Sequence, residues 1–167
     1  MAKMSAGILL FRRVQSTLEV FLVHPGGPLW RKRDRGAWSI PKGEIESEED
    51  ALETAVREFS EETGCRVEGS FIDLGSIRQK GGKIVFAWAV AGNCDASSIR
   101  SNTFRMEWPP RSGNLKEFPE IDRAAWMGVE QAREKINIAQ MEFIERLTTR
   151  LGSSREAVPG YPGNRTK

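Results

Sequence analysis

Short apolar runs bounded by polar turns mark the first half of the chain and indicate strands. The runs from Ser5 to Arg12 and from Leu18 to His24 predict two strands joined by a polar turn. A second pair is predicted over Arg66 to Gln79 and Lys83 to Ala91, because Gly81-Gly82 between them is a strong hairpin-turn signal. We therefore expect two strand pairs before the middle of the chain.

A helical pattern separates these two pairs and is predicted to run from Glu48 to Thr63. Its core face carries Leu52, Ala55, Val56 and Phe59 at the i, i+3, i+4 and i+7 positions. Ser47 is a good N-cap, and Asp50 three residues later completes a capping-box pattern. Gly64 supplies the permissive residue that commonly ends a helix.

The second half of the chain predicts a long excursion, one more strand and two helices. The excursion covers Asn93 to Gly113, a length that favours a functional role over a simple connection. A strand is expected at Ala124 to Met127, followed by helices at Val129 to Lys135 and Ile138 to Leu151. A further short strand is expected earlier, at Trp38 to Pro41. Strands and helices interleave without strict alternation, which favours a mixed sheet flanked by helices, the α/β class.

Length and composition fit a single domain. The chain has 167 residues and a formal net charge of +2, which leaves no large basic field for nucleic acid. We expect the domain to cover residues 1–151 and a mobile tail, rich in Gly, Pro, Ser and charge, to cover 152–167. The apolar run at Ala6 to Phe11 is far too short to span a membrane.

The cysteine content fits an intracellular protein. Cys65 and Cys94 are the two cysteines, and we expect them not to form a disulfide framework. This expectation suits a reducing compartment. We therefore predict a cytoplasmic location and no membrane association.

Three glutamates within five residues of the predicted helix carry the first chemical signal. Glu58 and Glu62 are one turn apart, and Glu61 adds to the same negative surface. Like charges at i, i+4 destabilise a helix, and a bound cation would relieve the repulsion. Oxygen-only ligands suit Mg²⁺, with Mn²⁺ as the other candidate. Taken alone, the helix also fits a plain solvated acidic face.

The spacing around these glutamates is far more specific than the glutamates themselves. A glycine, five residues, a glutamate and seven residues precede an Arg-Glu-hydrophobic-any-Glu-Glu-any-Gly-hydrophobic run. The pattern is filled by Gly43, Glu49, Arg57, Glu58, Phe59, Glu61, Glu62, Gly64 and Cys65. It resembles the signature of the Nudix hydrolases, and further likeness extends over about Ser5 to Leu151. The resemblance implies an α/β/α sandwich with a mixed sheet and the motif helix packed against it.

The resemblance also implies roles for the residues of this motif. Metal binding falls to Glu58, Glu61, Glu62 and the backbone carbonyl of Gly43. Glu58 is also a candidate general base, and Arg57 is expected to orient a neighbouring glutamate, with a plain surface ion pair as the alternative. Glu49 is expected either to pair with Arg57 or to stabilise the helix dipole.

Residues outside the helix complete the candidate site. The downstream Glu120 resembles a position that often supplies an extra carboxylate in the family, as a ligand or base, with a solvated loop carboxylate as the alternative. Lys42, Trp38 and Arg111 are assigned to substrate binding. The lone His24 is expected to be structural. The aromatic residues that could stack on a base, although core packing is their more usual role, are Trp30, Trp88 and Trp108.

The predicted function is metal-dependent hydrolysis of a pyrophosphate linkage in a nucleoside polyphosphate, by water attack at phosphorus. The segment Trp38 to Gly43 resembles that of dinucleoside tetraphosphate hydrolases, whereas the stretches His24 to Gly27, Ser101 to Phe104 and Met106 to Gly113 resemble a bacterial subgroup of predicted nucleoside triphosphate pyrophosphohydrolases. Two alternatives stay open. One is removal of pyrophosphate from RNA 5′ ends, which the basic cluster Arg31 to Arg35 favours. The other is a non-catalytic nucleotide-sensing module on the same fold. The expected partner is a small-molecule substrate, and the oligomeric state is not readable from the sequence.

Overall fold

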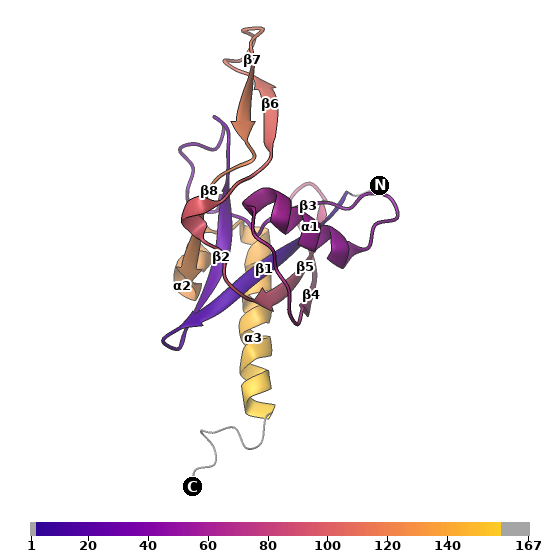
Figure 1. Cartoon of the computed structure of the whole chain (residues 1–167), viewed down its shortest axis with the longest axis vertical. Helices are drawn as coiled ribbons and strands as arrows, with labels where there is room; N and C mark the ends of the chain where they lie inside the picture. The colour runs from indigo at the N-terminus through magenta and orange to yellow at the C-terminus, as the bar shows by residue number, and fades with distance from the viewer. Residues whose placement is uncertain (1–2, 158–167) are drawn as a thin grey trace.

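The computed structural model describes residues 3–157, with side chains to residue 152, and contains one mixed sheet. The strand order is β4-β5-β1-β2-β8, with β3 paired to β1 (Figure 1). The strands are β1 Met4–Val14, β2 Thr17–Pro25, β3 Lys42–Glu44, β4 Ile72–Arg78, β5 Ile84–Ala91 and β8 Ile121–Gly128. Strands β1 and β5 run parallel and the other pairs are antiparallel. The central β1 is buried along most of its length, which explains its nearly continuous apolar run.

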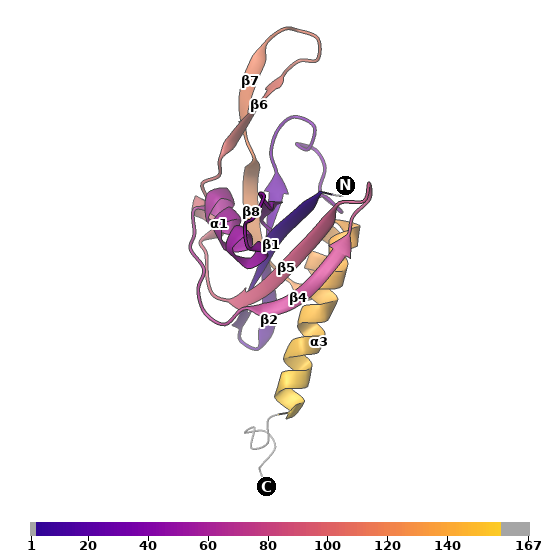
Figure 2. The ribbon, with the colours of Figure 1, turned by 90° about the vertical axis from the view of Figure 1, so that its right-hand side faces the viewer.

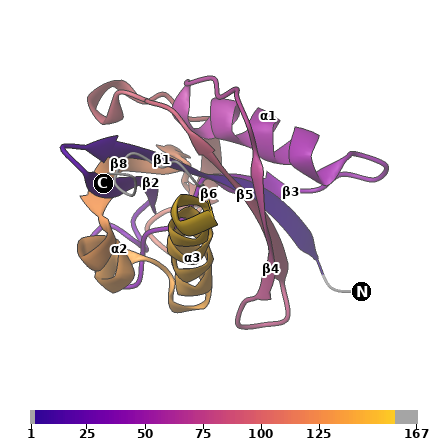
Figure 3. The same cartoon turned by 90° about the horizontal axis from the view of Figure 1, so that it is seen from below.

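Helices cover both faces of this sheet, with α1 on one side and α2 and α3 on the other (Figure 3). The helices are α1 Ala51–Thr63, α2 Val129–Lys135 and α3 Met141–Ala157, with short 3₁₀ turns η1 Ala96–Ser98 and η2 Ile138–Gln140. Each face has its own apolar core. Phe59 of α1 packs with Phe21 of β2 on one face, whereas Phe143 and Leu147 of α3 belong to the core on the other face. The predicted α/β/α sandwich is therefore confirmed.

The long excursion after β5 contains a two-stranded hairpin that projects from the body of the molecule (Figures 1 and 2). Its strands are β6 Thr103–Glu107 and β7 Leu115–Pro119, which pair only with each other. The hairpin leads directly into β8 through Glu120. It is thus anchored at one end, next to the start of the edge strand β8.

The helix that carries the glutamates begins later than its sequence pattern predicts. Asp50, rather than Ser47, is the N-cap, and its carboxylate accepts a hydrogen bond from the backbone nitrogen of Glu53 at 3.1 Å. Glu48 has a positive φ of 70°, a left-handed conformation that an α-helix cannot contain. The predicted end is confirmed, because Gly64 adopts the left-handed conformation with φ 82°.

Other boundaries also differ from the predictions, among them the start of β4, which lies at Ile72 rather than at Arg66. The segment Trp38 to Pro41 makes only isolated bridges, and the strand β3 starts at Lys42. Residues 152–157, expected to belong to a mobile tail, continue α3. The remainder of that predicted tail, 158–167, lies outside the described residues. The helix expected from Ile138 starts as a 3₁₀ turn, because Asn137 caps that turn by accepting from the Ala139 nitrogen.

Cys65 and Cys94 form a disulfide, so the expectation that they do not pair is wrong. Their Cα atoms lie 5.9 Å apart, within the normal range for a bridge. The residues are 29 positions apart in sequence, and only the packing of the end of α1 beside the loop after β5 brings them together. The cysteines therefore give no support for a reducing compartment, and the cytoplasmic location stays a prediction. Among residues 3–157, none of the helices combines the length and apolar character that a membrane crossing requires.

Candidate functional site

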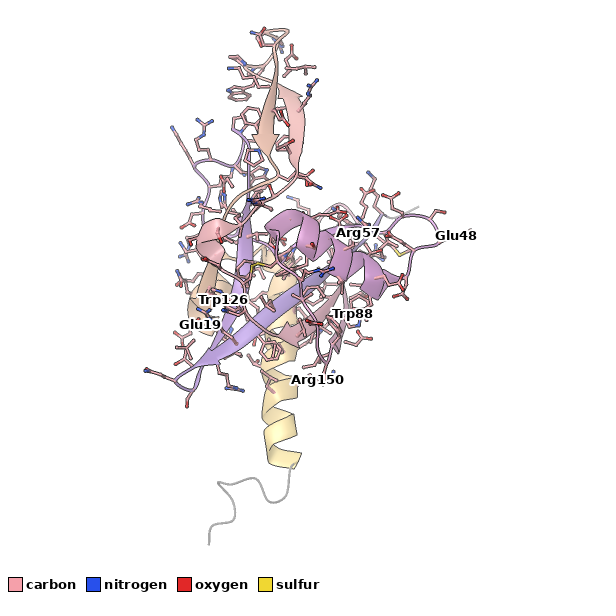
Figure 4. The ribbon with its side chains drawn as sticks, viewed as in Figure 1. Glu19, Glu48, Arg57, Trp88, Trp126 and Arg150 are labelled. Carbon is pink, nitrogen blue, oxygen red and sulfur yellow. A yellow bond between two sulfur atoms is a disulfide. The ribbon has the colours of Figure 1, made fainter. Side chains whose placement is uncertain are left out.

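Helix α1 presents Glu58 and Glu62 to β3 because its adjoining apolar face is fixed in the core. Ala55 and Phe59 are fully buried, and the Phe59 ring lies 5.8 Å from that of Phe21 on β2. Figure 4 shows α1 with Arg57 on it and Glu48 in the loop that leads into it. Since the apolar face fixes the rotation of the helix, the direction of Glu58 and Glu62 is fixed as well.

Gly43 on β3 lies directly under the carboxyl group of Glu58. A Cβ atom at position 43 would overlap this carboxyl group, so only glycine leaves room for it. The Gly43 backbone is therefore in contact with the Glu58 side chain, whose exposed fraction is only 17%. This contact gives the structural reason for the glycine at the start of the motif.

Burial and mutual repulsion mark Glu58 and Glu62 as an unusual carboxylate pair. Burial raises the pKa of Glu62, with the negative charge of Glu58 acting in the same direction and nearby Lys42 opposing both. Burial likewise raises the pKa of Glu58, against the lowering effect of Arg57. The pKa of Lys42 is lowered, mainly by burial. Because both carboxyl groups are penalised when charged, added positive charge at this point would be stabilising.

Arg57 joins three carboxylates on the adjoining side of α1. Its guanidinium donates to both oxygens of Glu49 at 3.0 and 3.1 Å, to Glu61 at 3.2 Å and to Glu58 at 3.1 Å. The hydrogen bonds from Arg57 lower the pKa of Glu49 to about 2, helped by the Glu46 nitrogen and the Thr54 hydroxyl. The Glu49–Arg57 contact named among the sequence alternatives is thus present. This network holds the backbone before α1 against the helix and turns Glu58 toward Gly43.

Glu120, which directly precedes the edge strand β8, lines the same pocket as Glu62. Its backbone nitrogen donates to the carbonyl of Asn102, and its carbonyl accepts from Gly26, each at 2.8 Å. Its negative charge raises the pKa of both Glu58 and Glu62. The structure therefore brings Glu120 to the acidic site, on a backbone held from both sides.

The acidic site opens into a pocket of about 320 Å³, which we call the acidic pocket. Its charged lining residues are Lys42, Glu62 and Glu120, and Trp30 forms part of the wall. Sequence reasoning missed Gln140, which is buried and accepts from the Ile40 nitrogen at 3.0 Å while its amide donates to Ser39 and Gln79. A glutamine just before an apolar helical pattern gave no signal of its own. Its hydrogen bonds fix the pocket floor.

Glu61 lies apart from this pocket. Its carboxylate is held by Arg57 and lines a separate surface depression with Arg66 and Glu68. It still acts on Glu58, whose pKa its charge raises. Its direct role in metal binding therefore stays a prediction.

Trp38 does not line the acidic pocket, and its buried position does not support its assignment to substrate binding. The side chain is 5% exposed, its indole nitrogen donates to Asp34 at 2.9 Å, and its ring packs edge-on against His24 at 5.2 Å. Its neighbours Ala37 and Ser39 line the pocket instead. In this extended segment alternate residues point in opposite directions, which sends Trp38 into the core.

His24 and Arg111 also have clear positions. His24 is fully buried, with its two ring nitrogens bonded to Asp122 and to the Arg33 carbonyl, so its predicted structural role is confirmed. Arg111 lies exposed in the turn between β6 and β7, at the end of the hairpin remote from the sheet (Figure 2). It is absent from the acidic pocket, so its assignment to substrate binding is not supported by its position.

The donor set fits a hard divalent cation, although it forms no complete cage by itself. Among residues 3–157, no three acidic, histidine or cysteine side chains stand close enough together to enclose a metal ion. The site does offer Glu58 against the Gly43 backbone, and Glu62, which accepts from the Lys42 nitrogen at 3.3 Å. Mg²⁺ usually keeps several water ligands and needs only one or two protein carboxylates. The residues present therefore fit Mg²⁺ or Mn²⁺ shared with a phosphate group.

Comparison with known proteins identifies relatives of this chain by sequence. MutT4, a candidate mutator protein of Mycobacterium tuberculosis, is 30% identical over 78% of this chain, and the asymmetrical bis(5′-nucleosyl)-tetraphosphatase of Mus musculus is 31% identical over 53%. The chain spans 50% and 64% of the length of these two relatives.

Solved structures show the same fold. A binary complex of the Caenorhabditis elegans Ap4A hydrolase superposes with a TM-score of 0.66 at 19% identity, covering 91% of this chain and 99% of that one. The NUDIX domain of Shewanella oneidensis NrtR, solved with ADP ribose, gives 0.61 at 16% identity, covering 90% and 89%. The sequence model of the NUDIX domain family matches residues 1–147, and the chain therefore belongs to the Nudix family.

Proposed function

We propose that this protein is a metal-dependent hydrolase of a pyrophosphate linkage in a nucleoside polyphosphate, either a dinucleoside polyphosphate or a nucleoside triphosphate. The observation that carries the proposal is that Glu62, Glu120 and Lys42 line one acidic pocket, with Glu58 close enough for its charge to raise the pKa of Glu62. Two carboxylates and one ammonium around a small cleft, with the Glu58 carboxylate beside them, suit a polyanion that arrives with its cation. The names of the tetraphosphatase and Ap4A hydrolase relatives point to the same substrate class.

The metal would be held by Glu58, Glu62 and the Gly43 carbonyl, with Glu61 as a further candidate. When bound, Mg²⁺ would neutralise phosphate charge and polarise the phosphorus centre toward attack by water. Lys42 would bind a phosphate oxygen, and its place in the pocket lining on β3 supports this role. Its burial strengthens such a contact by excluding water.

Proton transfer falls to one of the carboxylates, and positioning falls to Arg57 and Gln140. Glu120 or Glu58 would take a proton from the attacking water. The two carboxylates are close enough for the charge of Glu120 to raise the pKa of Glu58. Arg57 is a positioning residue, because it holds Glu58 in place and turns no group toward the acidic pocket itself. The hydrogen bonds of Gln140 keep the pocket floor fixed during the reaction.

Product analysis tests this proposal. The purified protein would be incubated with Mg²⁺ and diadenosine tetraphosphate, the common dNTPs or 8-oxo-dGTP, and the products separated by chromatography. ATP plus AMP would establish cleavage of a dinucleoside tetraphosphate, whereas a nucleoside monophosphate plus pyrophosphate would establish a pyrophosphohydrolase. Absence of turnover with all of these, in protein shown to be folded, would contradict the proposal.

A further inference from the structure

A second pocket, mainly apolar, adjoins the acidic pocket. It has a volume of about 350 Å³ and lies between the loop 25–30 and strand β6. Its side-chain walls are Leu29, Trp30, Phe104 and Met106. We call it the hairpin pocket. Pro25, Trp30 and Glu120 line both pockets, so the two adjoin at these residues, and we call the pair the recess, with an acidic end and an apolar end.

The hairpin has one apolar face, and that face is turned toward this pocket. Along β6, Phe104 and Met106 are half-buried, whereas Thr103, Arg105 and Glu107 are exposed. Phe118 on β7 stands opposite Phe104, with ring centroids 5.9 Å apart. A two-stranded ribbon is marginal in water by itself, and an apolar face on it is stabilised only when something covers it.

The base of the hairpin is locked to the loop that forms the opposite wall. The Phe104 ring lies against Gly27, where an added Cβ would come within 2.8 Å of the ring. Gly27 also has a φ of 96°, so both its space and its backbone favour glycine. The Gly26 nitrogen donates to Glu120 at the junction of the hairpin with β8. The pocket walls are therefore preformed, as in most small-molecule sites.

The chemistry of the recess identifies one kind of occupant. The acidic end suits phosphates with a cation, and the apolar end suits a flat group with an aromatic face. Among the eight residues that line the hairpin pocket, Glu120 alone is ionisable, and it lies where the two pockets meet. A nucleobase joined to a phosphate chain has this polarity.

We propose that the hairpin pocket binds the nucleobase of the substrate, stacked between Trp30 and the apolar face of β6. The proposal rests on the proposed function, because it assigns the base end of the same substrate. Stacking tolerates every base, since each has a π-face, and the walls offer few side-chain groups to distinguish one base from another. The pocket thus favours a nucleotide over a bare polyphosphate without selecting strongly among bases.

Binding of two matched probes tests this without any turnover. The nucleotide probe is α,β-methylene-ADP and the base-free probe is methylenediphosphonate, which carries the same phosphonate group. Both would be titrated with Mg²⁺ into the full chain by calorimetry. Met106→Ala and Trp30→Leu remove opposite walls, whereas Arg105→Ala changes the exposed face of the same strand and serves as the control.

We expect Met106→Ala and Trp30→Leu each to weaken the nucleotide probe by about fivefold or more, given the usual contribution of base stacking. Met106→Ala, whose side chain lines only the hairpin pocket, should not change binding of methylenediphosphonate by more than about twofold, and Arg105→Ala should leave both probes unchanged. Melting temperatures close to that of the unmodified chain would show that the variants are folded. Because no bond is cleaved, this result stands even if the product analysis finds no hydrolysis.

Three outcomes would overturn the proposal. One is an equal loss of both probes in the wall variants, and another is no loss of the nucleotide probe in either variant. The third is concentration-dependent self-association in light scattering that Met106→Ala abolishes while nucleotide binding stays unchanged. That result would make the apolar face of the hairpin an interface between two copies of the chain.

Discussion

Helix α1 and the β6–β7 hairpin both contribute to one recess, yet they are built in different ways. The helix is fixed to the sheet by fully buried side chains such as Phe59, and its acidic side is held further by Arg57. The hairpin pairs only with itself, and Phe104 and Met106 are merely half-buried. Groups that must be placed within a fraction of an ångström are thus on the rigid element. Groups that recognise the shape of a substrate are on the projecting one.

The largest expected effect is on turnover, at the rigid element. Glu58→Gln should lower the rate of hydrolysis by about a hundredfold or more, because it removes a metal and base candidate. The side chain lies over Gly43 rather than in the apolar core, so the melting temperature should stay near that of the unmodified protein. Steady-state kinetics with Mg²⁺ would measure the first effect and thermal unfolding the second. Full activity of this variant would contradict the site assignment.

The two regions should also differ in their contribution to stability. Phe59→Ala should lower the free energy of unfolding by about 3–5 kcal/mol, because it leaves a cavity between α1 and the sheet. Leu115→Ala on β7 should change it by less than about 0.5 kcal/mol, since Leu115 is 66% exposed. Denaturant unfolding of both variants measures the contrast. Comparable losses would show that the hairpin is as firmly packed as the helix.

Gly43 tests how closely the sheet and the helix must meet. Gly43→Ala places a methyl group on the Glu58 carboxyl position, so hydrolysis should fall by about tenfold to a hundredfold through displacement of that side chain. Gly152→Ala is the matched control, because nothing lies within 4 Å of its added Cβ and it is in helix α3. Kinetic assays of both variants make the comparison. Equal activity in the two would show that the contact between Gly43 and Glu58 is dispensable.

The smallest effect concerns the ion pairs that hold the start of α1. Glu49 has its pKa lowered to about 2 in the folded chain, from an ordinary value of 4.5. It therefore stabilises the fold above about pH 4.5, and that stabilisation is lost as the pH falls toward 2. Glu49→Gln should melt slightly earlier than the unmodified protein at pH 7. The difference in melting temperature between the two proteins should shrink as the pH falls toward 2. Thermal melts between pH 7 and pH 2 measure it, and a difference that grows on acidification would refute this role of Glu49.

Local patterns in the chain predicted the elements that rest on neighbouring residues. Gly81-Gly82 predicted the β4–β5 hairpin, and Gly64 predicted the end of α1. The start of α1 was misplaced because Ser47 and Asp50 are both good caps. The backbone of Glu48, in a left-handed conformation, leaves only Asp50 at the helix start.

Patterns shared by distant segments were harder to interpret. Trp38 was assigned to the substrate from its place beside the motif, but an extended segment turns alternate residues to opposite sides. The pairing of Cys65 with Cys94 was not expected, because sequence spacing carries no information on which loops pack together. Glu120 was named from a resemblance, and its meeting with Glu62 was visible only in the fold.

By itself, the sequence determined the helix with its three glutamates, the glycines at its approach and its end, and the family to which the motif points. These depend on contacts within a few turns of one chain segment, which spacing encodes directly. Only the tertiary structure decided that Lys42, Glu62 and Glu120 share one pocket and that an apolar pocket from the hairpin adjoins it. Those contacts join segments that are far apart in the chain, and the packing of both faces of the sheet determines them.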